Sequence, residues 1–362
     1  MSKKEKKFSI LNTLLLLIDI VVSLLLLISV LAGNFKPSAY PYIAFIGLCF
    51  PYLLIAEILF LLIFISRKSK LLFVPVLFIL ISIPSISKIL TLHKNDNIDD
   101  KNAIKIVSYN VKNLSNSNIN KTNDSIFDKI FDYLHESKAD VLMLQEFYYG
   151  DKNLDKVVSE LKNLTGTEYH CYTKYYTNSS NAIITLSKYQ IININSIRFS
   201  NNKSFAVYCD MIKGNDTIRL INTHLQSLHI TKDEYSAIPQ SGNEVRVKSA
   251  RIYRKVTTAF QRREEQVKAI APIISKSPYS IILCGDFNDT PNSYAYHTIH
   301  KYLDDAFSEA GNGFGFTFRE LPLLRIDYMF SSKDVRSTFF KIDRLKGLSD
   351  HNVIIGKFKL HE

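Results

Sequence analysis

The chain has 362 residues and a formal net charge of +11, and 46% of its residues are hydrophobic. This length allows two or three domains. The positive charge does not by itself indicate a nucleic-acid-binding protein, because residues 1–94 carry +7 and the longer remainder carries only +4.

Three apolar runs occupy the start of the chain. Phe8 to Ala32 and Tyr42 to Ser66 are each long enough to cross a bilayer, which requires about 20 residues. Leu71 to Ile86 is shorter and contains two prolines, and we expect it to form a third span. The first run is too long for a cleavable signal, and another span follows it closely. The sequence therefore predicts three transmembrane helices before the soluble part.

Basic residues indicate how these spans are oriented. Cations precede the first run and separate the second from the third, whereas Lys36 alone lies between the first and second runs. The positive-inside rule then places the N-terminus in the cytoplasm. Three crossings predict a multi-pass protein of the cell (inner) membrane, with the soluble domain on the exoplasmic or periplasmic side. If the third run lies in the interface instead, the domain is cytoplasmic. The cations are Lys3, Lys4, Lys6, Lys7, Arg67, Lys68 and Lys70.

Two carboxylates, Asp19 and Glu57, lie within the predicted spans. Antiparallel helices with a rise of about 1.5 Å per residue place them at similar depths. They either share a proton or bind a partner, or they are protonated side chains tucked between helices.

The next segment, Lys94 to Lys101, is polar and has no apolar periodicity. It predicts a linker over residues 94–102, between a membrane anchor at residues 1–93 and a catalytic domain at residues 103–362.

The soluble part mixes strand-like runs with a few amphipathic segments. Helices are predicted over Ser125 to Glu136 and Val256 to Ser275. A hairpin turn is predicted at residues 214–216, which read Gly-Asn-Asp. This mixture favours a layered α/β (α+β) domain over a doubly wound Rossmann sheet. The predicted strands are Ala103 to Asn110, Val141 to Gln145, Ala182 to Leu186 paired with Gln190 to Phe199, Phe205 to Ile212 paired with Thr217 to His224, Ile281 to Gly285, Arg325 to Phe330 and Val353 to Lys359.

Leu228 to Arg254 is a polar segment that is too long for an ordinary connection. It either forms a loop over the site that selects the substrate, or is an insertion without a role. The seven cations between Arg246 and Arg263 form either a basic patch or, as we favour, a solvated helix face.

At six places an apolar run ends in an acid, an amide or an imidazole. If the strands pack side by side, these ends converge on one rim, where polar groups can form a site without interrupting the core. The residues are Asn110, Glu146, Asn222, His224, Asp286, Asn288, Asp327, Asp350 and His351.

The chemistry of this set is that of phosphoester hydrolysis. Its carboxylates suit Mg2+, or Mn2+, because these cations prefer oxygen ligands. His351 stands next to an acid and can act as a base, with a second carboxylate fixing its tautomer. Asn288 and His224 can donate to a developing phosphorane. These parts indicate metal-assisted hydrolysis. The carboxylates suited to the metal are Glu146, Asp286 and Asp350.

Six segments resemble, in the same order, the motifs of the endonuclease/exonuclease/phosphatase superfamily. That superfamily includes deoxyribonuclease I, abasic-site endonucleases, neutral sphingomyelinases and inositol polyphosphate 5-phosphatases. The resemblance covers nearly all of residues 103–360. It implies a four-layered α/β sandwich of two packed mixed sheets flanked by helices. The segments are SYNVKNL, LMLQEF, INTHLQS, CGDFNDTP, RIDYMF and LSDHNVI.

The resemblance also implies roles for individual residues. Glu146 resembles the principal metal-binding acid, and Asn110 resembles the residue that helps to hold the metal or the phosphate. Asp350 resembles the acid of the terminal acid–histidine pair and is grouped with the metal ligands. Asp286 resembles the acid that orients or deprotonates the attacking water. Asn288 resembles the amide that stabilises the transition state.

Three further residues complete the implied machinery. His351 resembles the terminal catalytic histidine, and Asp327 resembles the residue that supports it. His224 resembles the phosphate-contacting histidine, which argues against abasic-site activity. Structural alternatives are that Asp327 pairs with Arg325 and that Asn222 braces a turn. A further structural alternative is that Asn110 caps a turn.

We therefore expect a membrane-anchored, Mg2+-dependent phosphoric ester hydrolase, either a phosphodiesterase or a phosphatase. Its expected partners are the lipid bilayer and a phosphoester substrate, which is a lipid head group or a nucleic acid. No protein partner is inferred. The alternatives are an exported nuclease that degrades DNA or RNA, and a non-catalytic phosphate-binding membrane protein.

Overall fold

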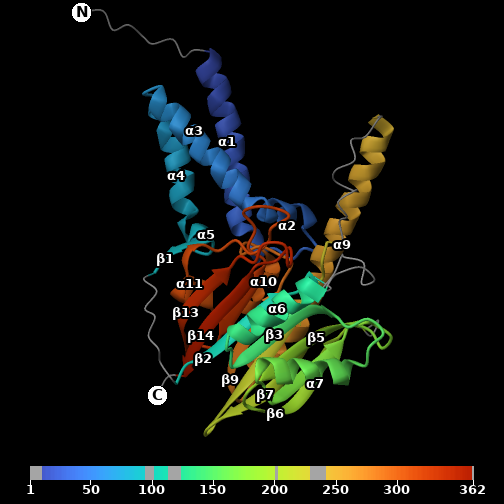
Figure 1. The fold of residues 1–362 in the computed structure, drawn as a ribbon. Helices are drawn as coiled ribbons and strands as arrows, with labels where there is room; N and C mark the ends of the chain where they lie inside the picture. The colour runs from blue at the N-terminus through green and yellow to red at the C-terminus, as the bar shows by residue number, and fades with distance from the viewer. Residues whose placement is uncertain (1–9, 94–101, 113–123, 200–202, 229–241, 361–362) are drawn as a thin grey trace, which may run out of the picture.

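Two six-stranded sheets form the soluble part of the computed structural model (Figure 1), which describes residues 10–93, 102–112, 124–199, 203–228 and 242–360. The first sheet has the order β13 (Val335–Asp343), β14 (Val353–Leu360), β2 (Ile104–Asn110), β3 (Val141–Tyr148), β5 (Asn181–Ser187) and β4 (Tyr169–Lys174). The second has the order β10 (Asp304–Asp305), β12 (Asp327–Ser331), β9 (Ser280–Asp286), β8 (Asp216–His224), β7 (Ser204–Lys213) and β6 (Gln190–Arg198). Both sheets are mixed, because β2 runs parallel to β3 and β8 runs parallel to β9.

The main core lies between the two sheets, and helices cover their outer faces. Ile106 and Met143 of the first sheet share one fully buried cluster with Leu220 and Ile282 of the second. The predicted sandwich of two mixed sheets flanked by helices is therefore confirmed. The covering helices are α6 (Asp124–Glu136) and α7 (Leu154–Thr165) on the first sheet, and α9 (Gly242–Ser275) and α10 (Tyr294–His300) on the second.

Two of the predicted strand pairings have opposite outcomes. The hairpin around Gly214 is confirmed, because β7 and β8 are antiparallel neighbours. The predicted pairing of β5 with β6, which follow each other in the sequence, is wrong. Strand β5 pairs with β3 and β4, and β6 pairs with β7. Strand β5 is buried along almost its whole length, whereas β6 is an exposed edge strand. The short connection between them carries the chain from one sheet to the other.

Helix α9 also differs from the prediction. It was expected to begin at Val256, but it begins at Gly242 and runs to Ser275. The polarity of this stretch suggested a loop, yet its arginines and lysines and its one alanine are good helix formers. The rest of the predicted long segment, residues 229–241, lies outside the described residues.

The N-terminal region is a bundle of apolar helices. Helix α1 (Ile10–Leu31) packs against α3 (Phe50–Ser66) and α4 (Phe73–Ile81). Among the described residues one helical stretch, Ile10–Asn34, is long and apolar enough to cross a membrane. A second qualifies only if α2 (Pro41–Leu48) and α3 count as one span despite a 61° bend.

The prediction of three transmembrane helices is thus corrected to one, or at most two, within the described residues. The physical reason lies in the prolines. Pro51 and Pro84 each stand at the beginning of a new helix, α3 and the short α5 (Ile83–Ile86), and so divide the apolar runs. The third run consequently yields only a shorter apolar helix, Lys70–Ile81.

Asp19 and Glu57 are both fully buried within this bundle. The Ser23 hydroxyl, one turn after Asp19, donates to Glu57 Oε1 at 2.7 Å. The two acids therefore lie between the helices rather than on an outer face.

The N-terminal helices are joined directly to the soluble domain. Strand β1 (Leu90–Leu92) pairs with β11 (Asn312–Phe314). The Ser38 amide and hydroxyl both donate to the Glu264 carboxylate of α9, at 2.9 and 3.1 Å. Residues 94–101 of the predicted linker lie outside the described residues, and the domain boundaries stay a prediction.

His297 of α10 lies in this junction and is half-buried. Its Nε2 accepts a hydrogen bond from Lys88 Nζ at 3.3 Å. Its ring packs so close to Gly33 that an added Cβ there would lie 2.4 Å from the ring. Burial and the Lys88 cation lower the pKa of His297 to about 4. The imidazole is therefore neutral in the folded protein near neutral pH.

We expect acid to weaken the folded protein through His297. The folded pKa lies below the unfolded value, so this contribution is present above the unfolded pKa of about 6.5 and is lost as the pH falls toward about 4. The loss should be on the order of 2 kcal/mol at about pH 5. Thermal unfolding of the full chain in detergent should show a smaller acid-induced drop in Tm for His297→Gln than for the wild type. Equal drops in both proteins would contradict this assignment.

Candidate active site

Polar side chains from both sheets meet at one end of the sandwich. Parallel neighbours end at the same edge of a sheet, so β2 and β3 deliver their last residues together, as do β8 and β9. The groups delivered are Asn110 at the end of β2, Glu146 in β3, His224 at the end of β8, Asp286 at the end of β9, and Asp327 at the start of β12.

Asp286 is the centre of this cluster and is fully buried. Its Oδ2 accepts from Asn110 Nδ2 at 2.9 Å and from Asn288 Nδ2 at 3.0 Å. Its Oδ1 accepts from the Asn288 amide at 2.7 Å. Burial raises the pKa of Asp286, and the neighbouring Asp327 carboxylate acts in the same direction. The carboxylate is thus fixed in orientation and is a better proton acceptor than an exposed aspartate.

Two imidazoles face the Asp286 carboxylate. His224 Nε2 lies 3.6 Å from Asp286 Oδ2 and 3.3 Å from Glu146 Oε1. His351 Nε2 lies 3.7 Å from the same Asp286 oxygen. Both separations from Asp286 exceed the hydrogen-bond range, so neither Nε2 atom forms a hydrogen bond to this carboxylate.

Asp327 orients His351. Its carboxylate oxygens lie 3.0 and 3.2 Å from His351 Nδ1, and both side chains are buried. Burial opposes a charge on the imidazole, but the carboxylates of Asp327 and Asp286 outweigh it and raise the pKa of His351 to about 10. The alternative partner, Arg325, instead forms a buried bidentate ion pair with Asp305, at 2.6 Å for each bond.

The backbone is strained at two of these residues. Glu146 and Asn288 both have a φ of 52°, in the left-handed region that such residues rarely adopt. Glu146 also lies at a register shift between β3 and β5. Near the end of β9, Gly285 approaches β8 so closely that an added Cβ would lie 1.8 Å from the Thr223 carbonyl oxygen. Strain of this kind persists where the surrounding structure imposes it, and it gathers at functional sites.

Asp350 lies at the edge of the cluster. One of its oxygens is 3.9 Å from His351 Nε2, and the other is 2.6 Å from Lys112 Nζ. Lys112 also pairs with Glu320 at 2.9 Å. The structure therefore brings together the predicted site residues of both sheets, but it places Asp350 in a separate ion-pair group beside them.

Buried polar side chains support the site from beneath. Gln145 Nε2 donates to Asn222 Oδ1 at 2.7 Å, and Asn222 Nδ2 donates to the Ile184 carbonyl at 2.9 Å. Asn222 thus ties the two sheets together instead of bracing a turn. Tyr175, which the sequence did not suggest, accepts from the Glu146 amide and lies 2.6 Å from His224 Nδ1. If its hydroxyl donates to Nδ1, neutral His224 carries its proton on Nε2, toward the site.

Arg263 is a second supporting residue, and its environment differs from the prediction. It belongs to the run expected to be a solvated helix face, but it is 1% exposed. Its Nε lies 3.0 Å from Asp289 Oδ2, and its NH1 donates to the Asn288 carbonyl at 2.7 Å. Phe260 and Val267, three residues before Arg263 and four residues after it, are buried on the same side of α9, and this spacing is the sequence signal that could have placed Arg263 on the inner face.

Replacing Arg263 with methionine should destabilise the protein by about 3–5 kcal/mol, because Asp289 would be left buried without its counter-charge. Turnover should fall as well, since the Asn288 carbonyl loses its donor. Chemical unfolding of the purified chain measures the first effect. The double variant Arg263→Met with Asp289→Asn serves as the control and should regain part of the stability. A loss below about 1 kcal/mol in the single variant would contradict the prediction.

The donor set fits a hard divalent cation. Asn110, Glu146 and Asp286 offer amide and carboxylate oxygens, which Mg2+ and Mn2+ prefer. Asp286, Asp327 and His351 form another group with the geometry to hold a metal ion, because their potential ligand atoms lie within 4.8 Å of one another. Burial raises the pKa of Glu146, while His351 and Asn110 oppose that rise.

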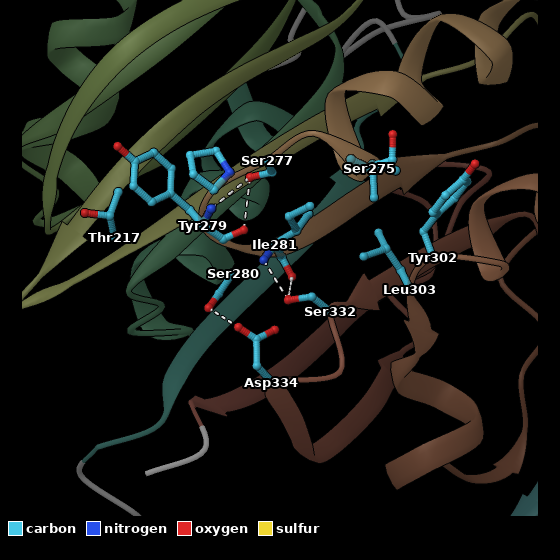
Figure 2. A pocket seen from close by; sticks show the side chains of 12 residues that line it. Thr217, Ser275, Ser277, Tyr279, Ser280, Ile281, Tyr302, Leu303, Ser332 and Asp334 are labelled. Atoms are coloured by element: carbon cyan, nitrogen blue, oxygen red, sulfur yellow. Dashed lines mark hydrogen bonds between the residues drawn. The ribbon is translucent and has the colours of Figure 1, made fainter.

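A different pocket, with a volume of about 450 Å³, lies at the opposite end of the strands of the second sheet. Figure 2 shows Tyr279, Ser280 and Asp334 among the residues that line it. Ser280 is the first residue of β9, whereas Asp286 is the last, so the whole length of the strand separates this pocket from the polar cluster. The polar side chains in its lining carry hydroxyls and one carboxylate, without the imidazoles of the cluster.

Comparison with known proteins gives matches for both parts of the chain. Residues 107–351 match the profile of the Endonuclease/Exonuclease/phosphatase family. Residues 12–89 match a profile described as Domain of unknown function (DUF8431). No curated protein matches the chain.

Several solved structures share the fold. An endonuclease/exonuclease/phosphatase from Beutenbergia cavernae DSM 12333 is 14% identical with a TM-score of 0.53, over 72% of each chain. A functionally unknown conserved protein from Enterococcus faecalis V583 is 16% identical with a TM-score of 0.51, over 71% of this chain and all of that one. The human Nocturnin catalytic domain with bound sulfate anion is 16% identical with a TM-score of 0.50, over 71% of this chain and 94% of that one. At these identities the likeness establishes the fold alone.

Proposed function

Because the chain belongs to the endonuclease/exonuclease/phosphatase family, we propose that it is a metal-dependent phosphoester hydrolase anchored in a membrane. The single observation that carries this proposal is the cluster centred on Asp286. There a fixed carboxylate, two imidazoles and two amides come together at one end of the sandwich, and this set of groups is suited to contacting water and a phosphoryl group.

In the proposed reaction the chain's own groups orient and move protons. Asp286 Oδ2 accepts a proton from, or orients, the attacking water, because Asn110 and Asn288 hold its oxygens in place. His351, charged through its contact with Asp327, donates Nε2–H to an oxygen of the phosphate. His224 Nε2 contacts a second oxygen. Positioning and electrostatic stabilisation of this kind supply most of the catalysis of phosphoryl transfer.

Asn110, Glu146 and Asp286 would hold the metal, with Asp350 at the edge of the set. When bound, a divalent cation neutralises charge on the phosphoryl oxygens and polarises phosphorus toward attack. The identity of the cation is proposed as Mg2+, with Mn2+ as the alternative, on the basis of the oxygen donors alone.

Assaying the purified full chain with a generic phosphodiester and a generic phosphomonoester tests the hydrolase proposal. Activity that requires Mg2+ or Mn2+ and disappears with a chelator supports it. Phosphate binding without turnover of either substrate, in the presence of both cations, would favour the non-catalytic alternative.

The substrate is proposed to be a phosphoester at the membrane surface, because the N-terminal helices are joined to the domain by hydrogen bonds and a strand pair. A lipid head group fits this placement better than a soluble nucleic acid. Comparing sphingomyelin and phosphoinositide vesicles with plasmid DNA separates the two. Hydrolysis of DNA alone would leave the exported nuclease as the better description.

Membrane anchoring is proposed to occur through Ile10–Asn34. A single crossing with a cytoplasmic N-terminus leaves the catalytic domain on the exoplasmic or periplasmic side, whereas a second crossing through α2 and α3 returns it to the cytoplasm. We propose residues 1–93 as the anchor and 103–362 as the catalytic domain. Protease treatment of intact cells identifies the side, because only an external domain is digested.

A further inference from the structure

Helix α9 is much longer than the surface it covers. From Val256 onward one side of it is buried against the second sheet. From Glu244 to Lys255 its side chains are exposed or half-buried. Figure 1 shows this N-terminal half projecting from the sandwich on the side where α1 and α3 stand. More than two helical turns therefore extend beyond the domain, toward the region of the N-terminal helices.

This projecting half is amphipathic and strongly basic. Val245, Ile252 and Val256 follow the spacing of seven and four residues that places side chains on one helix face. Val245, at the outer end of that face, is 48% exposed. Between residues 244 and 255 there is a single acid, Glu244, against five cations. The cations are Arg246, Lys248, Arg251, Arg254 and Lys255.

Aromatic side chains mark the point where this half meets the N-terminal region. Tyr253 of α9 stacks on Tyr42 of α2, with ring centroids 5.4 Å apart. Tyr42 is 67% exposed, and Tyr40 and Phe45 are exposed beside it. Aromatic residues gather at the boundary between membrane and water, where their rings are half in lipid and half in solvent.

Since α1 enters a bilayer in the proposed function, on which this inference rests, we propose that the basic side chains of residues 244–255 of α9, which rises on the same side as α1 in Figure 1, bind anionic lipid head groups at the surface of that bilayer. A cluster of Lys and Arg beside a membrane-spanning helix is typical of a segment that binds anionic lipids. Its positive charge complements an anionic leaflet, whereas two copies of this half would repel each other.

The contact would also position the active site. Arg263 lies on the same helix and holds the carbonyl of Asn288, which in turn bonds to Asp286. A surface-bound α9 therefore fixes the height of the catalytic cluster above the head groups.

The test uses the absence of tryptophan from the chain. Single tryptophans are introduced as Val245→Trp on the apolar face of α9, as Ala250→Trp on its opposite side, and as Leu17→Trp on an exposed side of α1. The full chain is reconstituted in phosphatidylcholine vesicles with or without phosphatidylglycerol. Quenching by lipids brominated in their acyl chains then reports which tryptophan contacts lipid.

We expect Leu17→Trp to be quenched in both kinds of vesicle, and Val245→Trp to be quenched far more in those with phosphatidylglycerol. Ala250→Trp should be quenched less than Val245→Trp. Combining Arg246→Glu and Arg251→Glu with Val245→Trp should abolish the difference between the vesicles, while hydrolysis of a soluble phosphodiester stays unchanged.

Two results would overturn the proposal. If the quenching of Val245→Trp depends neither on lipid charge nor on charge reversal at Arg246 and Arg251, this half of α9 does not bind the anionic head groups. A blue-shifted Val245→Trp emission in detergent without anionic lipid would mean that protein covers this face. In either case, normal quenching of Leu17→Trp would still support the membrane anchor, and hydrolysis of the soluble substrate would still support the enzyme. Failure of this inference is therefore distinguishable from failure of the proposed function.

Discussion

Replacing Asp286 with asparagine is expected to lower turnover of a phosphodiester about 100-fold to 10,000-fold, the range for loss of a catalytic acid–base group. The two side chains have nearly the same shape, and the new amide oxygen can still accept from the Asn288 backbone amide. The negative charge that attracts the imidazoles and accepts the proton of the water would be gone. Steady-state kinetics should show the loss mainly in kcat rather than in KM.

Asp334→Asn is a matched control for this variant. Asp334 lies at the other end of the second sheet, in the pocket of Figure 2, and accepts from the Ser280 hydroxyl at 2.5 Å. The same chemical change there should leave turnover unaltered. If Asp334→Asn were inactive and Asp286→Asn active, the catalytic site would lie in that pocket and not at Asp286.

The sequence predicted which polar residues lie at the strand ends better than it predicted which strands pair. Apolar runs that end in Asn110, Glu146 or Asp286 mark where buried strands end, and this signal is local. The partners of a strand are not local, and for that reason the neighbouring runs β5 and β6 were expected to pair although they belong to different sheets. Strands β4 and β13 contain no long uninterrupted apolar run and were not predicted at all.

Supporting residues were missed for a related reason. Arg263 and Tyr175 contact the catalytic groups from segments distant in sequence, so their partners could not be read from the local pattern. The apolar runs at the N-terminus were correctly identified as hydrophobic, but length alone could not show that Pro51 and Pro84 begin new helices within them. Charge at the strand ends is thus readable from sequence, whereas contacts made across the fold are not.

Asp327 is expected to act through His351, and a double-mutant cycle tests this directly. His351→Ala should lower kcat about 100-fold to 10,000-fold, because the group that donates to the phosphate is lost. Asp327→Asn keeps an oxygen for Nδ1 but removes the charge that favours the imidazolium, so it should cost less, about 10-fold to 100-fold. Adding Asp327→Asn to His351→Ala should then cost almost nothing further. Residues that work as one unit are non-additive, whereas independent contributions multiply. A double variant slower than His351→Ala by the full factor of Asp327→Asn would mean that Asp327 serves another ligand of the site, and the cluster of Asp286, Asp327 and His351 would then be the better candidate for the metal.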